Sequence, residues 1–145
     1  MNRFWDPENN YQAGMLKEYR HWSLDVSYHQ HTFGNFIVFC KREDVEKISE
    51  LTNEEMLELK TVLHEIESAL LNNPMFKPDR FNYWQMGNLV HHLHIHGIPR
   101  FKTERSFLGR VWKDEDSTKP VVWTYENQTH ETVEKLKIEM KKFLR

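Results

Sequence analysis

The stretch His92-Leu93-His94-Ile95-His96 carries the strongest indication of fold in this sequence, because histidine alternates there with an apolar residue. Successive side chains of a β-strand point to opposite faces, so a strand here would place all three imidazoles on one face. The two apolar residues between them would point to the other face, where they can join a core. His91 then belongs to the opposite face, and we expect no role for it in a site.

Three explanations of this pattern stay open on physical grounds alone. The histidines can simply belong to an exposed strand face. They can bind a metal, although the outer two lie about 13 Å apart at Cβ and the chain has no cysteine cluster or His-Glu-x-x-His. They can also perform phosphoryl chemistry, in which one imidazole attacks phosphorus and its neighbours donate hydrogen bonds to the phosphate. Histidine suits this third role because its pKa lies near working pH.

Composition limits the class of protein. A chain of 145 residues fits one domain. Its net charge of -2 gives no general attraction for a nucleic acid polymer or an anionic membrane. No apolar run approaches the roughly 20 residues of a membrane span, and the start of the chain lacks a signal-peptide core. A single cysteine, Cys40, suits a reducing compartment, and we expect a cytoplasmic protein in which Cys40 is a small buried residue.

The remaining sequence predicts an α+β protein with a mainly antiparallel sheet. Strands are predicted over residues 21–28, 36–40, 80–86 and 89–98, with a weaker strand near 121–125 and turns at 32–35 and 87–88. Residues 1–18 read as an irregular lead-in or a short helix. These elements form one domain, residues 1–145.

Two helices complete the prediction. The first begins at Thr52-Asn53-Glu54-Glu55, a capping box, and ends at Asn72-Asn73-Pro74. Its predicted apolar stripe is Met56, Leu59, Leu63, Ile66 and Leu70. The second begins near Thr129, with Val133, Leu136, Met140 and Phe143 on one side.

The alternating histidines and the segments around them resemble the histidine triad (HIT) family, and bacterial HIT-type nucleotide hydrolases in particular. Further matching segments are residues 30–34, 36–42, 50–55, 81–84, 87–88, 99–101, 107–109 and 112–114. The resemblance covers residues 20–120, leaving a lead-in (1–18) and a C-terminal strand and helix (121–145). It implies an antiparallel half-barrel crossed by one long helix, usually as a homodimer.

The resemblance also implies a reaction. Members cleave at the α-phosphate of a nucleotide conjugate through a nucleotidyl-histidine intermediate, without a cofactor or metal. By position His94 is the nucleophile, while His92 and His96 orient it and assist the phosphate oxygens and the leaving group. Expected substrates are dinucleoside polyphosphates, nucleoside phosphoramidates or adenylyl conjugates. The alternatives are a non-catalytic nucleotide-binding or regulatory protein, and a metal-binding protein using the same histidines.

Five further residues are candidates for substrate binding by the same resemblance. Asn88, in the turn before the triad, is placed to contact phosphate, although a turn asparagine is also common for conformational reasons. Asn82 matches a polar position on the neighbouring strand. Trp22, Leu24 and Asp25 would line the nucleoside pocket.

Three positions depart from the family pattern. Asn35 and Glu43 stand where many members have histidine, and Gly97 replaces an apolar residue just after the triad. The histidine at the position of Asn35 supports the triad from behind in those members, so we expect Asn35→His to keep or raise activity. The departures leave the proton relay and the substrate subclass open.

Overall fold

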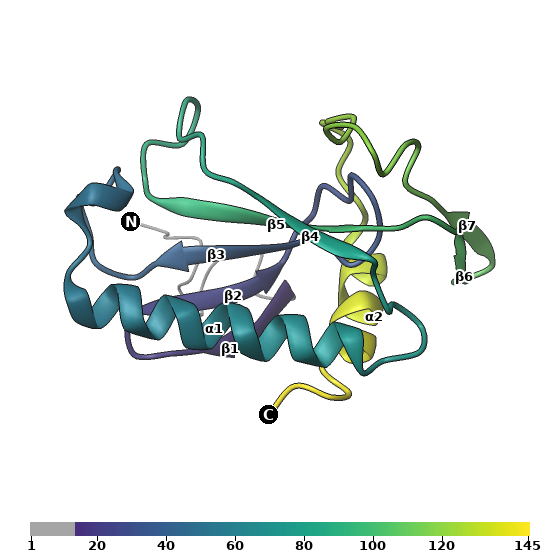
Figure 1. Ribbon diagram of the computed structural model, residues 1–145, viewed down its shortest axis with the longest axis horizontal. Coiled ribbons are helices and arrows are strands. Elements are labelled where there is room, and N and C mark those ends of the chain that lie inside the picture. The colour runs from purple at the N-terminus through teal and green to yellow at the C-terminus, as the bar shows by residue number, and fades with distance from the viewer. Residues whose placement is uncertain (1–13) are drawn as a thin grey trace.

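A computed structural model describes residues 14–145 and shows one sheet crossed by a long helix (Figure 1). The sheet has five strands in the order β1-β2-β3-β5-β4, and every neighbouring pair is antiparallel. Its strands are β1 (Met15–Glu18), β2 (Trp22–Val26), β3 (Phe36–Cys40), β4 (Arg80–Trp84) and β5 (His94–Arg100). A separate hairpin joins β6 (Arg105–Phe107) to β7 (Arg110–Trp112). The predicted α+β class is confirmed.

The long helix α1 (Asn53–Leu71) begins where its capping box predicts. The Thr52 hydroxyl accepts a hydrogen bond from the Glu55 amide at 3.1 Å, and the Glu55 carboxylate accepts from the Thr52 amide at 2.8 Å. The buried positions are Glu55, Leu59, Val62, Ile66, Ala69 and Leu70. Met56, which the periodicity assigned to the stripe, is 44% exposed. The buried face is therefore turned from the predicted one at the start of the helix, where Glu55 is drawn inward.

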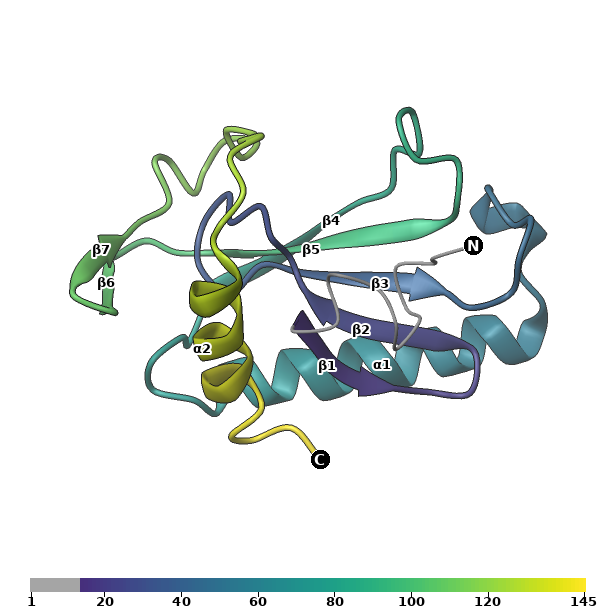
Figure 2. The same cartoon turned by 180° about the vertical axis from the view of Figure 1, so that it is seen from behind.

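The C-terminal helix α2 (His130–Met140) starts at its predicted cap, Thr129. It contacts β1 and β2, and Figure 2 shows it crossing one end of the sheet. Three of its four predicted apolar residues are fully buried, whereas Phe143 lies beyond the helix and is 51% exposed. No helix in the described part of the chain combines the length and the apolar character that crossing a membrane requires.

Three sequence predictions are corrected here. Part of the lead-in, residues 15–18, is the edge strand β1; residues 1–13 lie outside the described part of the chain. The histidine strand starts at His94 rather than at residue 89, because the Leu93 amide bonds to the Val45 carbonyl and only the Leu93 carbonyl is bonded to β3, at the Cys40 amide. Residues 121–125 form no strand, and the hairpin of β6 and β7 was not predicted.

Candidate active site

Side chains of the central strands alternate between the two faces of the sheet, and two cross-strand rows lie on one face. One cross-strand row consists of Asp25, Ile37, His96 and Trp84, and a second of Ser23, Phe39 and His94. Between them lies the row of Leu24, Val38 and Ile95, which is buried in the core. The sequence prediction that Leu93 and Ile95 join the core is confirmed.

The face that carries the two rows opens into a cavity of about 410 Å³, a size typical of small-ligand sites. Strands β2, β3 and β5 supply its floor, the loop before the triad one side, and residues 123–127 another. The lining residues are Asp25, Val26, Tyr28, His29, Ile37, Phe39, Met86, Gly87, Asn88, Leu89, Val90, His94, His96, Trp123, Tyr125 and Asn127.

His94 is held in one tautomer by the main chain. Its Nδ1–H donates to the carbonyl oxygen of His92 at 2.6 Å, and a carbonyl can only accept. In the neutral ring the lone pair therefore lies on Nε2. The ring stacks against Phe39 with centroids 5.8 Å apart, which fixes its plane. His94 thus has the free nitrogen that a nucleophile at phosphorus needs.

His96 lies beside His94 on the cavity wall, with ring centroids 5.0 Å apart and planes nearly perpendicular. Burial lowers the pKa of His96 to about 3, and repulsion from His94, His31 and His29 adds to this effect. The ring is consequently neutral near neutral pH. It offers one N–H donor and one acceptor, rather than a positive charge.

Only His94 and His96 belong to β5, so the sequence prediction that His92 lies on the same strand is wrong, and His92 is not among the residues that line the cavity. The residue precedes β5, and its Nε2–H donates to the carbonyl of Cys40 at the end of β3. Burial lowers its pKa. The His92 side chain thus ties the loop to β3, and its carbonyl orients the His94 ring.

Two predicted binding residues lie on the cavity wall. Asp25 is 4% exposed, and its Oδ1 accepts from the Ser23 hydroxyl at 2.6 Å. Burial raises the pKa of the Asp25 carboxyl to about 7 despite this hydrogen bond. Asn88 lines the rim of the cavity, and its backbone carbonyl contacts His91 Nε2 at 3.2 Å.

Three other predicted binding residues lie elsewhere. Trp22 and Leu24 are fully buried on the core side of β2, and the Trp22 Nε1–H donates to the Glu55 carbonyl of α1 at 2.9 Å. Asn82, on β4, accepts from Arg100 at 2.8 Å. None of the three contributes to the cavity wall.

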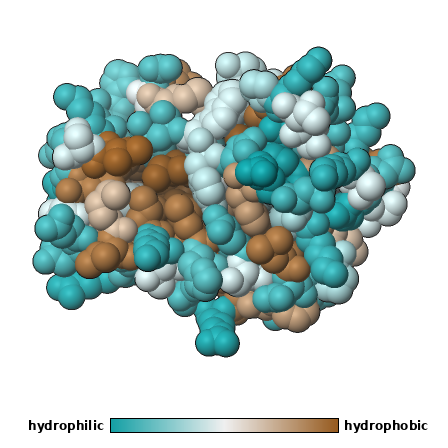
Figure 3. Space-filling view, in the orientation of Figure 1, coloured by the Kyte–Doolittle hydropathy of each residue, from teal (hydrophilic) through white to brown (hydrophobic). Residues whose placement is uncertain are grey.

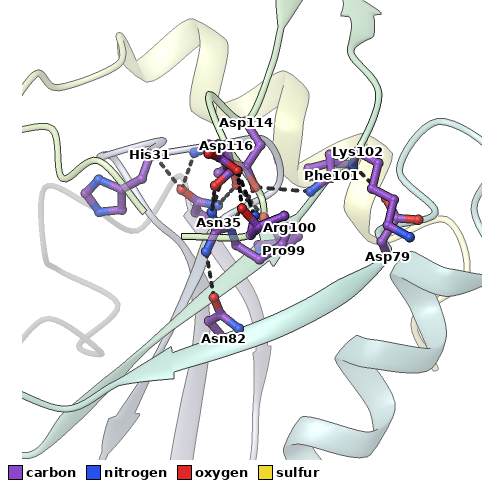
Figure 4. A network of polar contacts seen from close by, with 12 residues as sticks. His31, Asn35, Asp79, Asn82, Pro99, Arg100, Phe101, Lys102, Asp114 and Asp116 are labelled. Carbon is purple, nitrogen blue, oxygen red and sulfur yellow. Dashed lines mark hydrogen bonds and ion pairs between the residues drawn. The ribbon is translucent and has the colours of Figure 1, made fainter. Parts of the chain in front are cut away.

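The polar network around Arg100 fixes the far end of β5, as Figure 4 shows. Arg100 forms a two-point ion pair with Asp114, at 2.6 and 3.0 Å, and both side chains are only 2% exposed. The nearby Asn35 side chain accepts from the amides of His31 and Thr32 and donates to the Thr32 hydroxyl. In this structure Asn35 organises the turn before β3.

Sequence patterns missed the aromatic side of the cavity. Trp123 stacks almost parallel to Trp84, with centroids 5.2 Å apart, and stands edge-on to His96 at 5.0 Å. Tyr125 and Asn127 follow it along the same wall. The alternation of Val121, Trp123 and Tyr125 indicated a strand, and the density of aromatic residues was the one sign of another role.

The arrangement of the histidines also bears on metal binding. Within residues 14–145 no three histidine, cysteine, aspartate or glutamate side chains are grouped closely enough to hold an ion. Two of the residues that depart from the family pattern lie away from the cavity: Glu43 is exposed beyond β3, and Gly97 faces the ring of Phe36.

Comparison with solved structures finds the same fold in several proteins. A histidine triad protein from Sinorhizobium meliloti is 18% identical, with a TM-score of 0.69 over 92% of this chain and 91% of that one. A histidine triad protein from Marinobacter aquaeolei is 23% identical, with a TM-score of 0.63 over 90% and 87%. The diadenosine triphosphate hydrolase of Plasmodium falciparum is 14% identical, with a TM-score of 0.65 over 90% and 75%.

Family-level comparison of the sequence agrees with the fold. No curated protein matches the chain. The HIT domain model matches residues 31–103, half of the chain, and this segment includes β3, α1, β4 and the histidine strand. The protein therefore belongs to the histidine triad (HIT) domain family.

Proposed function

We propose that the protein is a nucleotidyl hydrolase or transferase that cleaves at the α-phosphate of a nucleotide conjugate. The observation that carries this proposal is the His94 ring, whose Nδ1–H is bound by a backbone carbonyl while Nε2 is left with its lone pair on a cavity wall. The substrate would be a dinucleoside polyphosphate, a nucleoside phosphoramidate or an adenylyl conjugate.

In the first step Nε2 of His94 attacks the α-phosphorus. The bond from phosphorus to the leaving oxygen or nitrogen breaks, its electron pair stays on the leaving atom, and that atom takes a proton from solvent. The ring N–H of neutral His96 donates to a phosphate oxygen as negative charge develops there. The product is a nucleotidyl-histidine.

In the second step water or another acceptor attacks the same phosphorus. The phosphorus–nitrogen bond breaks, its electron pair returns to Nε2, and the proton of the acceptor is released. A nucleoside monophosphate leaves when the acceptor is water. His94 is regenerated with its Nδ1–H still on the His92 carbonyl, so no proton needs to move within the ring.

The nucleoside would lie over β2 and β3. Ile37 and Phe39 offer apolar surface for a base, and Asp25 is the buried polar group beside them. Its carboxyl can accept a hydrogen bond from a sugar hydroxyl and thereby recover part of the solvation lost on burial. Asn88 at the rim would contact the phosphate.

A trapping experiment tests the reaction. The protein is mixed with a fluorogenic adenosine phosphoramidate, quenched within one turnover, and analysed by intact mass and peptide mapping. We expect a nucleotidyl adduct on His94, absent from His94→Ala and present in His91→Ala, whose exposed ring lies outside the cavity. No adduct and no turnover with any of the three substrate classes would overturn the proposal, and adenosine monophosphate binding would then favour the non-catalytic alternative.

Metal independence is part of the proposal. Activity should survive EDTA, because the hydrogen-bond donors and the nucleophile are supplied by histidine. Complete loss on chelation, restored by zinc, would favour the metal-binding alternative.

We further propose that the protein is a cytoplasmic homodimer. Strand β4 pairs only with β5, which leaves its other edge without a strand partner among the described residues. Figure 3, in the orientation of Figure 1, shows hydrophobic side chains gathered in a patch on the left side of the molecule. Ile48 and Met56 are each 44% exposed. A two-fold homodimer is the commonest soluble oligomer and would cover this surface. A monomer mass by light scattering at micromolar concentration would contradict this proposal.

A further inference from the structure

The segment 121–128 borders the cavity without belonging to the sheet. It is attached to the turn at residues 28–31 by three hydrogen bonds. The Thr124 amide donates to Nδ1 of His31 at 3.0 Å, His29 Nδ1–H donates to the Glu126 carbonyl at 3.1 Å, and the Gln128 amide donates to the Tyr28 carbonyl at 2.8 Å. The position of this cavity wall therefore depends on that turn.

His31 makes the central contact, and at an energetic cost. Because Nδ1 accepts, the neutral ring carries its proton on Nε2, and this buried Nε2–H has no hydrogen-bond partner among the described residues. An unmet buried donor is unfavourable. The ring gains instead a close stack on Trp123, with centroids 3.8 Å apart. Burial lowers the pKa of His31 to about 4, which keeps the accepting lone pair at neutral pH.

The turn that presents His31 is itself fixed to the histidine strand. The His31 backbone amide donates to the Asn35 side chain, and the neighbouring Thr32 hydroxyl donates to the Pro99 carbonyl of β5 at 2.6 Å. Figure 4 shows the His31 ring pointing away from Asn35 and the Arg100 network. The strand that carries His94 and His96 thus also sets the position of the His31 ring.

Trp123 transmits that position to His96. Trp123 stacks on both Trp84 and His31, and it stands edge-on to His96 with centroids 5.0 Å apart and planes 86° apart. A displaced Trp123 would leave His96 free to turn and would admit water beside it.

We propose that His31 is a positioning residue, which holds Trp123 against His96 so that the His96 ring stays shielded from solvent on that side and correctly oriented toward the substrate phosphate. The kinetic part of this inference rests on the proposed function. Misplacing a group by about an ångström can cost 10²-fold in rate. Loss of His31 therefore lowers kcat by about 10- to 100-fold and changes KM little, because the orientation of His96 matters most in the transition state.

Two variants separate the contacts of His31. His31→Phe keeps a flat ring for Trp123 but has no acceptor for the Thr124 amide. His31→Asn offers an amide oxygen to Thr124 but no stacking surface. His64→Ala, an exposed histidine on α1, is the matched control.

Two readouts need no substrate. Hydrogen exchange at the Thr124 amide should be faster in His31→Phe than in wild type or His31→Asn. The pKa of the His96 ring, followed by NMR, should rise in both variants, since both remove the repulsion from His31. The rise should be larger in His31→Asn, by about one unit or more, because that variant also loses the stack on Trp123 and water then reaches the ring. His64→Ala should change neither quantity.

Steady-state kinetics with the phosphoramidate complete the test. The proposal is overturned if Thr124 exchange in His31→Phe matches wild type, or if the His96 pKa stays unchanged in both variants. It is also overturned if kcat of both variants stays at the wild-type value. A wild-type protein without turnover would refute the proposed function instead, and the exchange and His96 pKa would still decide whether His31 positions Trp123.

Discussion

The ring of Phe36 occupies the space that a side chain on Gly97 would need. A Cβ at position 97 would lie 2.1 Å from Cε2 and 2.3 Å from Cζ of Phe36, which pairs with Gly97 across β3 and β5. Phe36 is fully buried, so its ring has no free space to move into. Glycine thus stands where the family has an apolar residue after the triad, and the Phe36 ring from the neighbouring strand fills the space that the larger side chain would take.

The pairing of these two residues predicts a non-additive mutant cycle. Gly97→Val alone should lower the free energy of unfolding by about 3 kcal/mol through overpacking, and Phe36→Ala alone by about 3–5 kcal/mol through a cavity. The double variant should lose clearly less than the sum, because each change relieves the defect of the other. Urea unfolding of the four proteins measures this coupling, and additive losses would refute it.

The histidines of the triad should differ in their effect on rate. His94→Ala should lower kcat by about 10³-fold or more, because the attacking atom is lost. His92→Ala should cost about 10- to 100-fold, since the carbonyl that orients His94 remains while the bond to Cys40 is lost. Steady-state kinetics with a nucleoside phosphoramidate compare the two. A His94→Ala protein with more than about a tenth of wild-type activity would contradict the mechanism.

The buried Asp25 carboxyl should make stability depend on pH. Its pKa of about 7 in the folded protein lies above the ordinary 3.8. The protonated form therefore contributes its full stability at low pH, and that contribution is lost as pH rises from about 4 to about 7. Asp25→Asn should remove the loss. At about pH 8 the variant should exceed wild type by a stability on the order of 3 kcal/mol.

Urea unfolding of wild type and Asp25→Asn across this pH range checks the prediction. The difference between the two proteins should shrink steadily toward about pH 4. A difference that is the same at both ends of the range would show that the Asp25 carboxyl is not the titrating group.

The structure reverses the expectation for Asn35→His. Asn35 is 1% exposed, and its amide accepts from two backbone amides and donates to the Thr32 hydroxyl. An imidazole has two ring nitrogens and cannot reproduce these three bonds, so at least one buried amide would lose its partner. We expect a loss of about 2 kcal/mol in stability and lower activity, because the same turn presents His31. Thermal unfolding and kinetics test this, and unchanged values for both would restore the original expectation.

Local signals in the sequence predicted much of the fold. The capping box at Thr52 located the start of α1, and the apolar run 36–40 coincides with β3. The prediction that Cys40 is buried is also confirmed. These features succeed because hydrogen bonds between near neighbours, or burial of a continuous apolar run, determine them.

Contacts between distant segments explain the failures. The strand of His94 starts late because Leu93 bonds to Val45, 48 positions earlier, and no local pattern records that bond. Likewise, Trp123 lies outside the sheet and stacks on Trp84 and His31, which are distant from it in the sequence. The sequence thus located His94 and His96 but not the wall beside them.

The oxygen that orients His94 belongs to the main chain, and this has an evolutionary consequence. Every residue at position 92 supplies the same carbonyl, so codon changes there can alter the surroundings of His94 without deleting the acceptor of its Nδ1–H. Only a backbone edit, such as an ester in place of the amide between residues 92 and 93, would weaken that acceptor directly. The tautomer of His94 is therefore insensitive to substitution at position 92. Residues that line the cavity can change during evolution without altering it.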